Sequence, residues 1–371
     1  MTSLEMWALF GFVLLAVAVY VLVVTAWLFA RCRGRGMAGK PEGDEHSEAP
    51  EPPRGRTDAS GLWVTEDVRE ADPGGRTHPI YKKLASLSSE VNSMSRGQLK
   101  QRLRDLGLEP RGTDTIISKR LTTYLRRQAI LQEPDPPWEL QNSVQTNPYG
   151  LQYLLVLDFE ATCEPVNPVD YVHEIIEFPV LLFNLKTLTV VSLLFSVSLR
   201  LSCCLQEDRF HSYCRPFLNP NLTDFCKNLT GIRQDQVDSA PYFTEVFRNF
   251  TKWLDARDLG NKLRFSLVTD CPWDIKECLF PQCVLSQVEF PQYATKWIDA
   301  RKLFGSFYRT KSGNLSSMLE KIGLKFEGRE HCGLHDSLNI ARVTERLIRD
   351  GCLLKYNRFM PQDLLASFDK S

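Results

Sequence analysis

The stretch of sequence that decides the fold reads Leu154-Leu155-Val156-Leu157-Asp158-Phe159-Glu160-Ala161-Thr162. Four consecutive apolar residues predict a buried strand, and the acids that follow predict a site opening to solvent at its end. Side chains two residues apart point to the same face of a strand, so Asp158 and Glu160 lie side by side. Neighbouring carboxylates repel each other, which raises the pKa of one unless a cation lies between them. Because Asp-x-Glu is also common in loops, this pair needs further partners.

Two later segments supply those partners. Asp270 follows the apolar run 265–268, and Asp274 is the nearest alternative ligand, although we expect it to cap its own helix. His331 and Asp336 flank the start of another predicted helix, where a structural histidine and a capping carboxylate are the ordinary alternatives. Together, the four acids would offer oxygen ligands to two divalent cations, and the histidine would accept a proton from a water attacking a phosphodiester.

The bulk composition limits the alternatives. The chain has 371 residues, of which 43% are hydrophobic and 24% are charged, which is typical of one large globular domain with a small one. The 45 basic and 45 acidic residues give no net charge, so binding to nucleic acid would depend on local patches. The 11 cysteines include no Cys-x-x-Cys pair, which favours reduced thiols over a zinc site.

The amino-terminal part permits two interpretations. Residues 6–30 carry no charge and are followed by Arg31, Arg33 and Arg35, which predicts a single-pass membrane anchor with a cytosolic enzyme behind it. Alternatively, residues 1–36 do not belong to the functional protein and Met37 begins a soluble one, found in the cytoplasm and in the nucleus or nucleolus. Residues 37–77 are acidic and rich in Pro, Gly and Ser, so we expect a disordered linker.

Residues 78–130 have a helical pattern and a basic character. Leucines at 99, 103 and 106, and apolar residues at 116, 117, 121 and 125, predict two short helices across the turn at 110–112. Residues 95–127 contain nine Lys and Arg against three Asp and Glu. The stretch resembles the SAP domain, a small helical module that binds nucleic acid, although Asp114 stands where that family usually has a lysine. A solvated basic face without a ligand is the alternative.

The SAP resemblance implies RNA contacts through basic side chains, whose candidates are Arg111, Lys119, Arg120, Arg126 and Arg127. A Pro-rich linker is expected at 131–147, a large α/β domain at 148–355 and a tail at 356–371. Within the α/β domain, strands are predicted at 151–157, 175–183 and 263–269, and helices at 243–256, 273–280, 314–322 and 334–349.

The order Asp-x-Glu, central Asp and His-x(4)-Asp resembles the DEDDh exonucleases. The segments Asp158-Phe-Glu-Ala-Thr-Cys-Glu, His173-Glu-Ile-Ile-Glu-Phe-Pro, Leu229-Thr-Gly-Ile, Trp297-Ile and His331-Cys-Gly-Leu resemble the Eri-type 3′-5′ exoribonucleases in particular. The resemblance implies an α/β, RNase H-like fold in which a mixed sheet is flanked by helices. It also implies an enzyme that releases nucleoside 5′-monophosphates.

The same resemblance implies roles for individual residues. Two Mg²⁺ ions would be held by Asp158, Glu160, Asp270 and Asp336, with Glu160 and His331 as the catalytic residues. The terminal nucleotide would be bound by Glu160, Ala161, Thr162, Phe225, Leu229, Trp273 and His331. For Phe225, Leu229 and Trp273, ordinary packing in the core is the alternative.

The implied substrate is RNA with a stem-loop and a single-stranded 3′ tail, such as histone mRNA, 5.8S rRNA or small interfering RNA. The implied partners are a histone stem-loop-binding protein and ribosomes. Two other functions stay open: a catalytically silent stem-loop RNA-binding protein and a DEDDh deoxyribonuclease. The presence of all four acids and the histidine argues against a catalytically silent RNA-binding protein, because buried charges without a function are costly.

One segment departs from the family. Residues 190–206 are apolar, nearly uncharged and without a counterpart in the relatives that the resemblance suggests. The segment is too short to span a membrane and has the β-propensity of an aggregation-prone sheet edge. Translated intron sequence would explain its abrupt character.

Overall fold

The computed structural model describes residues 55–57, 63–65, 78–144, 146–168, 171–190 and 209–368. The chain divides into two compact units, Met1–Pro73 with Val166–Val172, and Gly74–Pro165 with His173–Ser371. In the first unit, β1 (Gly55–Thr57) pairs antiparallel with β2 (Trp63–Thr65). The expected disorder of 37–77 is therefore wrong for these two strands, since Trp63, Val64 and Thr65 all favour extended backbone.

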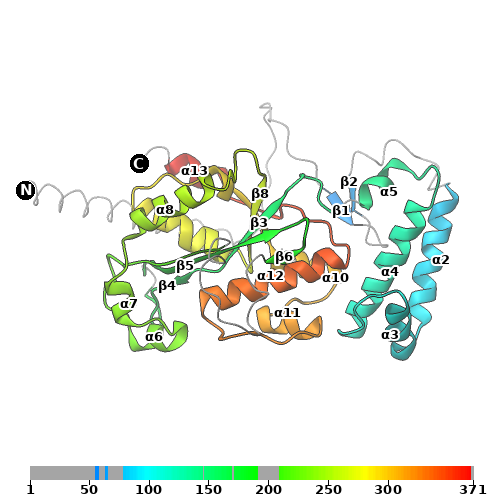
Figure 1. The fold of residues 1–371 in the computed structure, drawn as a ribbon, viewed down its shortest axis with the longest axis horizontal. Coiled ribbons are helices and arrows are strands. Elements are labelled where there is room, and N and C mark those ends of the chain that lie inside the picture. Colours follow the sequence, from blue (N-terminus) through cyan, green and yellow to red (C-terminus); the bar gives the residue numbers. More distant parts are fainter. Residues whose placement is uncertain are drawn as a thin grey trace, which may run out of the picture. The chain divides into compact units, whose positions relative to one another are not determined.

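The second unit is built on a mixed sheet in the order β10-β9-β8-β3-β5-β4, with β6 and β7 also paired to β5 (Figure 1). Its strands are β3 (Tyr153–Leu157), β4 (Glu160–Ala161), β5 (Ile175–Asn184), β6 (Thr189–Val190), β7 (Arg209–Tyr213), β8 (Phe265–Thr269), β9 (Lys296–Asp299) and β10 (Arg358–Phe359). Strands β3, β8 and β9 are parallel, whereas β5 is antiparallel to β3. The three strands predicted from the sequence are thus confirmed as β3, β5 and β8.

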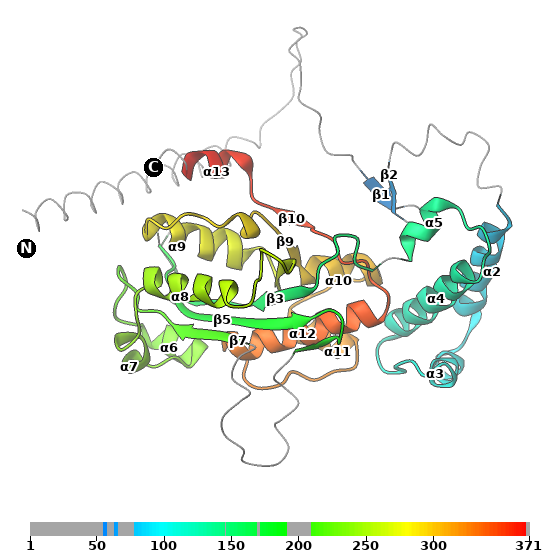
Figure 2. The same cartoon turned by 45° about the horizontal axis from the view of Figure 1, so that its top comes forward.

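Helices cover both faces of this sheet (Figures 1 and 2). One face, with Leu155 and Leu157, packs against α8 (Phe243–Asp255) and α9 (Phe280–Leu285). The other face, with Leu154 and Val156, packs against α10 (Ala300–Tyr308), α11 (Leu315–Lys321) and α12 (Gly333–Arg349). Both faces of β3 are buried, which explains its continuous apolar run. The shorter α6 (Asp224–Thr230) and α7 (Gln234–Asp238) follow β7.

The helix predicted at 273–280 has an irregular start. It begins as a π-helical segment, η2 (Asp274–Leu279), and continues directly into α9; a 3-10 turn, η3 (Gln292–Ala294), precedes β9. Pro281 has no backbone N–H to donate, and the wider π turn ends where that residue enters α9. Such π segments are frequent at functional sites.

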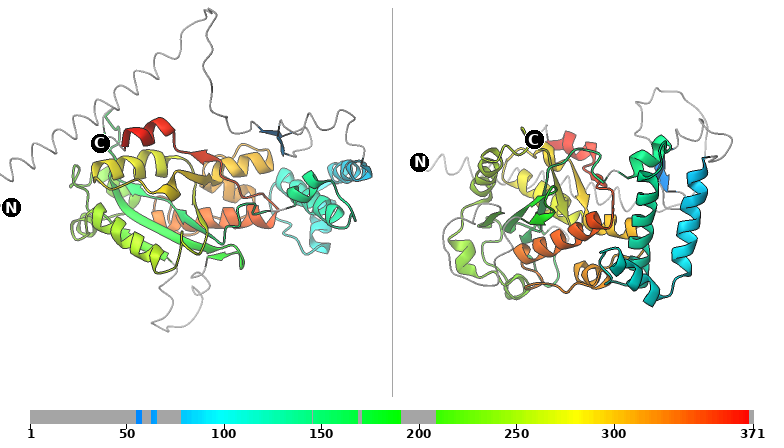
Figure 3. Two further views of the ribbon diagram at one scale, coloured as in Figure 1. Left: turned by 90° about the horizontal axis from the view of Figure 1, so that it is seen from above. Right: turned by 45° about the vertical axis from the view of Figure 1, so that its right-hand side comes forward.

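The basic amino-terminal region contains three helices rather than the two expected. They are α2 (Pro79–Ser93), α3 (Arg96–Asp105) and α4 (Asp114–Leu131), with α2 beside α4 (Figure 3, right). The additional helix α2 buries Ile80, Leu84 and Val91. Together with Leu87, they recur at helical spacing, a pattern that the sequence-based prediction of two helices overlooked.

The regions expected to be linker and tail contain short ordered elements. Residues 131–147 include α5 (Trp138–Ser143). The tail at 356–371 includes β10, which extends the sheet, and α13 (Gln362–Phe368), whose Leu364 and Leu365 pack against the core beneath α8 and α9. Both expectations are therefore wrong in part, because a few apolar residues suffice to dock a short element onto an existing core.

Two sequence-based expectations fall on undescribed residues. Residues 6–30 lie outside the described ranges, and so does the expected insertion 190–206 beyond Val190, which ends β6. Within the described ranges, no helix is both long enough and apolar enough to cross a membrane.

Candidate active site

The Asp-x-Glu pair lies where the central strand β3 ends. Asp158 directly follows β3, and Glu160 begins β4, where a bulge shifts the register against β5. Glu160 is only 8% exposed, whereas Asp158 is half-buried. The geometry confirms that both acids occupy the carboxyl end of the sheet's central strand, the end at which α/β folds commonly bind ligands.

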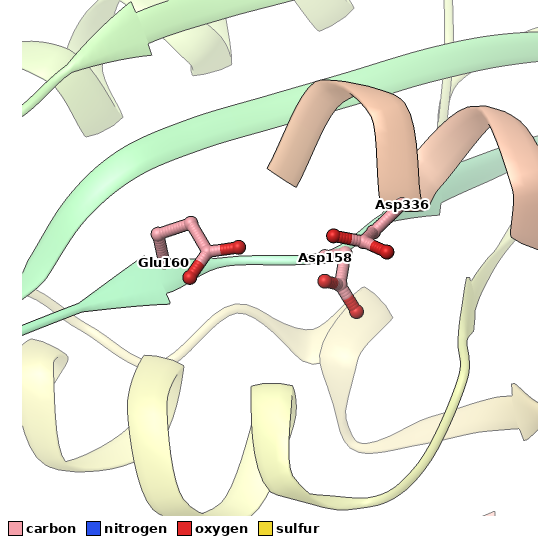
Figure 4. Close-up of side chains that lie close together, drawn as sticks. All are labelled: Asp158, Glu160 and Asp336. Carbon is pink, nitrogen blue, oxygen red and sulfur yellow. The ribbon is translucent and has the colours of Figure 1, made fainter. Parts of the chain in front are cut away.

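Asp336 reaches the same place from the first turn of α12 (Figure 4). Its Oδ2 accepts a hydrogen bond from the backbone N–H of Cys332 at 3.0 Å. The helix approaches closely because Gly333 has no side chain: a Cβ there would overlap the carbonyl oxygen of Asp158 and lie 2.9 Å from Cγ of Pro179. The backbone N–H of Gly333 also donates to Glu177 of β5 at 3.0 Å. These contacts clamp the start of α12 onto the sheet.

Asp158, Glu160 and Asp336 form one acidic cluster. One oxygen from each carboxylate lies within 4.8 Å of the others (Figure 4). Burial and repulsion from Asp336 raise the pKa of Glu160 to about 9, and burial raises that of Asp336 to about 7. Burial and neighbouring acids hold the pKa of Asp158 well above its ordinary value. Such a set suits a divalent cation with oxygen ligands, which would offset the repulsion.

The structure reverses the expected ranking of Asp270 and Asp274. Both oxygens of Asp270 are occupied by the guanidinium of Arg301, with Nε 3.3 Å from Oδ1 and Nη2 on Oδ2. Asp274 is 2% exposed, and its Oδ1 accepts the backbone N–H of Phe159, between the paired acids, at 2.9 Å. Among the surrounding charges, that of Asp274 contributes most to raising the pKa of Asp158.

Asp274 is therefore better placed than Asp270 to complete the acidic cluster, which corrects the sequence-based choice. Its contact with the segment between the two acids also corrects the expectation that it merely caps its own helix. Burial raises the pKa of Asp274 to about 7, in keeping with the other members of the cluster. On this geometry, we expect the central acid to come from the π-helical segment that follows β8 rather than from the end of β8 itself.

His331 lies in the loop before α12 and is exposed. Its φ of 59° is in the left-handed region, which few non-glycine residues adopt and which is frequent at functional sites. The backbone N–H of His331 also interacts with Asp336 and lowers the pKa of that carboxyl. The sequence-based expectation that His331 belongs with Asp336 is consistent with this geometry, and its role as a base stays a prediction.

The residues expected to bind the ribose differ in their availability. Thr162 donates its N–H to the carbonyl of Glu174 at 2.9 Å, and its own carbonyl contacts Nδ1 of His173 at 2.8 Å. Its hydroxyl accepts the N–H of Glu174. The backbone groups of Thr162 have protein partners, whereas its hydroxyl accepts one hydrogen bond and still has an O–H to donate, so ribose recognition by Thr162 stays a prediction. Ala161, which is buried in β4 beside Glu160, stays a prediction.

Phe225 and Leu229 stand four residues apart on α6, so they share one face of that helix. This helix lies beside β4, since Sγ of Cys226 is 3.7 Å from the carbonyl oxygen of Ala161. Phe225 is 39% exposed and Leu229 is half-buried, so neither is an ordinary core residue. Trp273 is half-buried, packs against the core and meets the ring of His173 edge-on at 5.5 Å. Base packing by these three side chains stays a prediction.

Arg120 is not available for RNA. It is 2% exposed, and its Nε donates to Oδ1 of Asp350, at the end of α12, at 2.7 Å. The hydroxyl of Tyr308 in α10 donates to the other oxygen of Asp350 at 2.7 Å. The guanidinium of Arg120 therefore joins the amino-terminal helices to the sheet domain, which corrects its assignment as a phosphate contact.

The other basic candidates are more accessible. Arg127 is exposed, and Arg111 is exposed but paired with Glu109 at 2.9 Å. Arg126 is half-buried and donates to a serine of α2, whereas Lys119 lies 5.0 Å from the centre of a phenylalanine ring in α10. These four stay candidates, with Arg127 the most open to a ligand.

Two buried acids that sequence reasoning left without a role support the site. Glu174 is 1% exposed and accepts backbone N–H groups from residues 217, 218 and 219. Glu177 is 2% exposed and is shared between Gly333 and Nε2 of His211, which is 2.7 Å away. The sequence could have indicated this role, because both acids lie within the largely apolar segment 173–179, where a buried charge without a partner would be costly.

Known sequences resemble this chain over most of its length. A sequence model of the exonuclease family matches residues 155–344. The human 3′-5′ exoribonuclease 1 is 38% identical over 341 residues, which cover 90% of this chain and 89% of the human protein. The fission yeast 3′-5′ exonuclease eri1 (Schizosaccharomyces pombe) is 30% identical, over 69% of this chain and 88% of the yeast protein.

Solved structures agree. The structure reporting 3′-end specific recognition of a histone mRNA stem-loop by 3′-exonuclease has a TM-score of 0.52 and 39% identity, over 77% of this chain and 91% of that one. The nuclease domain of 3′hExo, a DEDDh family member bound to rAMP, has a TM-score of 0.52 and 45% identity, over 57% and 99% of the two chains. The resemblance predicted from the motifs is confirmed. The chain belongs to the exonuclease family and, within it, to the 3′-5′ exoribonucleases.

Proposed function

We propose that the protein removes nucleotides stepwise from the 3′ ends of RNA with Mg²⁺ as its cofactor and releases nucleoside 5′-monophosphates. The observation that carries this proposal is the cluster of Asp158, Glu160 and Asp336, whose oxygens lie within 4.8 Å of one another. Mg²⁺ prefers oxygen ligands and near-octahedral geometry, so an all-carboxylate cluster suits it better than it suits zinc.

In this mechanism, Asp158, Glu160 and Asp336 would hold the cations, and Asp274 would complete the negative charge beside Phe159. When bound, Mg²⁺ supplies positive charge for the phosphate and lowers the pKa of water. The imidazole of His331 accepts the proton of the attacking water. The water oxygen bonds to the phosphorus of the last phosphodiester, and the bond to the 3′ oxygen of the preceding nucleotide breaks. The product therefore keeps its phosphate on the 5′ oxygen.

The proposed substrate is RNA with a stem-loop and a single-stranded 3′ tail, since a solved relative of 39% identity recognises a histone mRNA stem-loop. We extend the proposal to 5.8S rRNA and small interfering RNA, which also present paired RNA next to a 3′ end. The basic amino-terminal helices would act as a SAP-like module that grips the paired part through phosphates. Because these RNAs occur in nucleus and cytoplasm, we propose that the enzyme works in both.

The test uses a 5′-labelled RNA stem-loop with a single-stranded tail, incubated with the full chain in Mg²⁺ or in EDTA. We expect stepwise shortening from the 3′ end that requires Mg²⁺ and is lost in Asp158→Ala and in His331→Ala. Asp235→Ala removes an exposed carboxylate paired with Arg233 and should leave the rate unchanged.

Other outcomes would point to other functions. Tight binding without shortening would favour a catalytically silent RNA-binding protein. Equal shortening of DNA of the same sequence would favour a deoxyribonuclease, because an RNA-specific site is expected to read the 2′-hydroxyl.

A further inference from the structure

A half-exposed arginine lies at the edge of the acidic cluster. Arg301 is in the first turn of α10, and its backbone N–H donates to the carbonyl of Asp270 at 3.1 Å. Its guanidinium also binds both carboxylate oxygens of Asp270. The Asp270 side chain is 10% exposed, whereas 37% of the Arg301 side chain faces solvent. A guanidinium has five N–H donors, and two of its nitrogens are engaged here, so Asp270 fixes the group without covering it.

This arginine belongs to the same end of the sheet as the catalytic acids. Asp270 follows β8, α10 follows β9, and these neighbouring strands are parallel, with Thr269 opposite Asp299. The negative charge of Asp270 also raises the pKa of Asp158, Asp274 and Asp336, so it lies within electrostatic reach of all three.

Helix α10 then leads from the acids to the basic amino-terminal helices. Its Phe307 lies under the ammonium group of Lys119 in α4, 5.0 Å from the ring centre. At about 1.5 Å per residue, roughly 9 Å of helix separate Arg301 from Phe307. An RNA strand with its 3′ end at the acids and its upstream part at these helices would pass the start of α10.

We propose that Arg301 binds a phosphate of the RNA strand entering the acidic cluster, and that Asp270 is the positioning residue that holds its guanidinium in place. This inference rests on the proposed RNA substrate. A planar guanidinium can bind a phosphate through paired N–H groups while its other edge stays on a carboxylate. It gives Asp270, which the metal cluster does not use, a defined task.

The test measures binding of a fluorescein-labelled single-stranded RNA oligomer to the full chain in EDTA, by anisotropy at several salt concentrations. Arg301→Gln alone would leave a buried carboxylate unpaired and could unfold the protein. The informative variant therefore combines Arg301→Gln with Asp270→Asn, which can hydrogen-bond to each other. We expect about tenfold weaker binding at low salt and a salt dependence shallower by about 0.7 in log–log slope, as for one lost phosphate contact.

Two matched controls isolate the contact. Asp270→Asn alone keeps the cation but weakens its anchor, so its affinity for RNA should lie between those of the wild type and the double variant. Arg264→Gln makes the same change in charge at an exposed residue just before β8, at the opposite end of that strand from Asp270, and should change nothing.

Wild-type affinity and salt slope in the double variant would overturn the proposal. The proposal also fails if Arg301→Gln alone binds RNA weakly and the added Asp270→Asn restores the affinity. In that case, Arg301 would serve only to neutralise Asp270. Shortening of the same RNA by the wild-type chain in Mg²⁺ is measured separately. If shortening occurs while the double variant binds normally, the Arg301 proposal fails and the proposed function stands; if the wild-type chain neither binds nor shortens RNA, both fail.

Discussion

Replacing Gly333 by alanine should disable the site without touching any charged group. The added Cβ would overlap the carbonyl oxygen of Asp158 and lie 2.9 Å from Cγ of Pro179, both parts of the sheet. Because neither is the end of a flexible side chain, the start of α12 has to move, and Asp336 moves with it. Overpacking of this kind costs about 1–3 kcal/mol of stability. A displacement of about 1 Å within a catalytic arrangement lowers the rate by about 100-fold.

The assay compares the rate of RNA shortening with the free energy of unfolding in urea for Gly333→Ala. The matched control is Gly97→Ala in α3, where an added Cβ meets only Oγ of Ser95 at 4.0 Å. The control should keep full activity and become slightly more stable, because alanine favours helix. The reasoning is refuted if Gly333→Ala keeps at least a third of the wild-type rate, since the close approach of α12 would then not position Asp336.

Further predictions concern the acids and the buried ion pair. Asp274→Asn should lower the rate of RNA shortening and weaken Mn²⁺ binding measured by calorimetry far more than Asp270→Asn; the opposite order would restore Asp270 as the central acid. Asp350→Ala leaves Arg120 buried and unpaired, so the free energy of unfolding in urea should fall by about 3–5 kcal/mol. The double variant Arg120→Met with Asp350→Leu should lower this free energy much less. Equal losses in the two variants would contradict a buried ion pair. In EDTA, the folded-state pKa of Glu160, about 9 against an ordinary value of 4.5, means that the folded state holds its proton to higher pH than the unfolded state does. Thermal stability should therefore fall as pH rises between these values, and Mg²⁺ should reduce that fall; a flat profile in EDTA would show that neither burial nor repulsion raises the pKa of Glu160.

Most of the sheet could be predicted from local sequence. The strands β3, β5 and β8 are buried on both faces, so they appear as continuous apolar runs that no other element explains. Helix α2 was missed although Ile80, Leu84, Leu87 and Val91 recur at helical spacing, so this omission was not forced by the sequence. Strand β10 escaped because two residues carry almost no periodicity, and its pairing depends on β9, far away in sequence.

The choice of the central acid shows where local reasoning ends. Asp270 and Asp274 are four residues apart, and both follow the same strand. Arg301, 31 residues away, occupies Asp270, while the π-helical turn aims Asp274 at Phe159. Arg120 was assigned to RNA on its charge alone, although its partner Asp350 is 230 residues away and removes it from solvent.

The sequence by itself determined the family, the sheet's central strand and the residue types of the site, because motif order and apolar runs are local properties of the chain. The tertiary structure alone decided which carboxylates lie in one cluster and which are paired with arginine. The physical reason is that the pKa and accessibility of a carboxylate depend on groups within a few ångströms, and folding brings those groups from distant segments. Gly333 illustrates both: the sequence shows a glycine before a helix, and only the fold shows that Asp158 leaves no room for a side chain there.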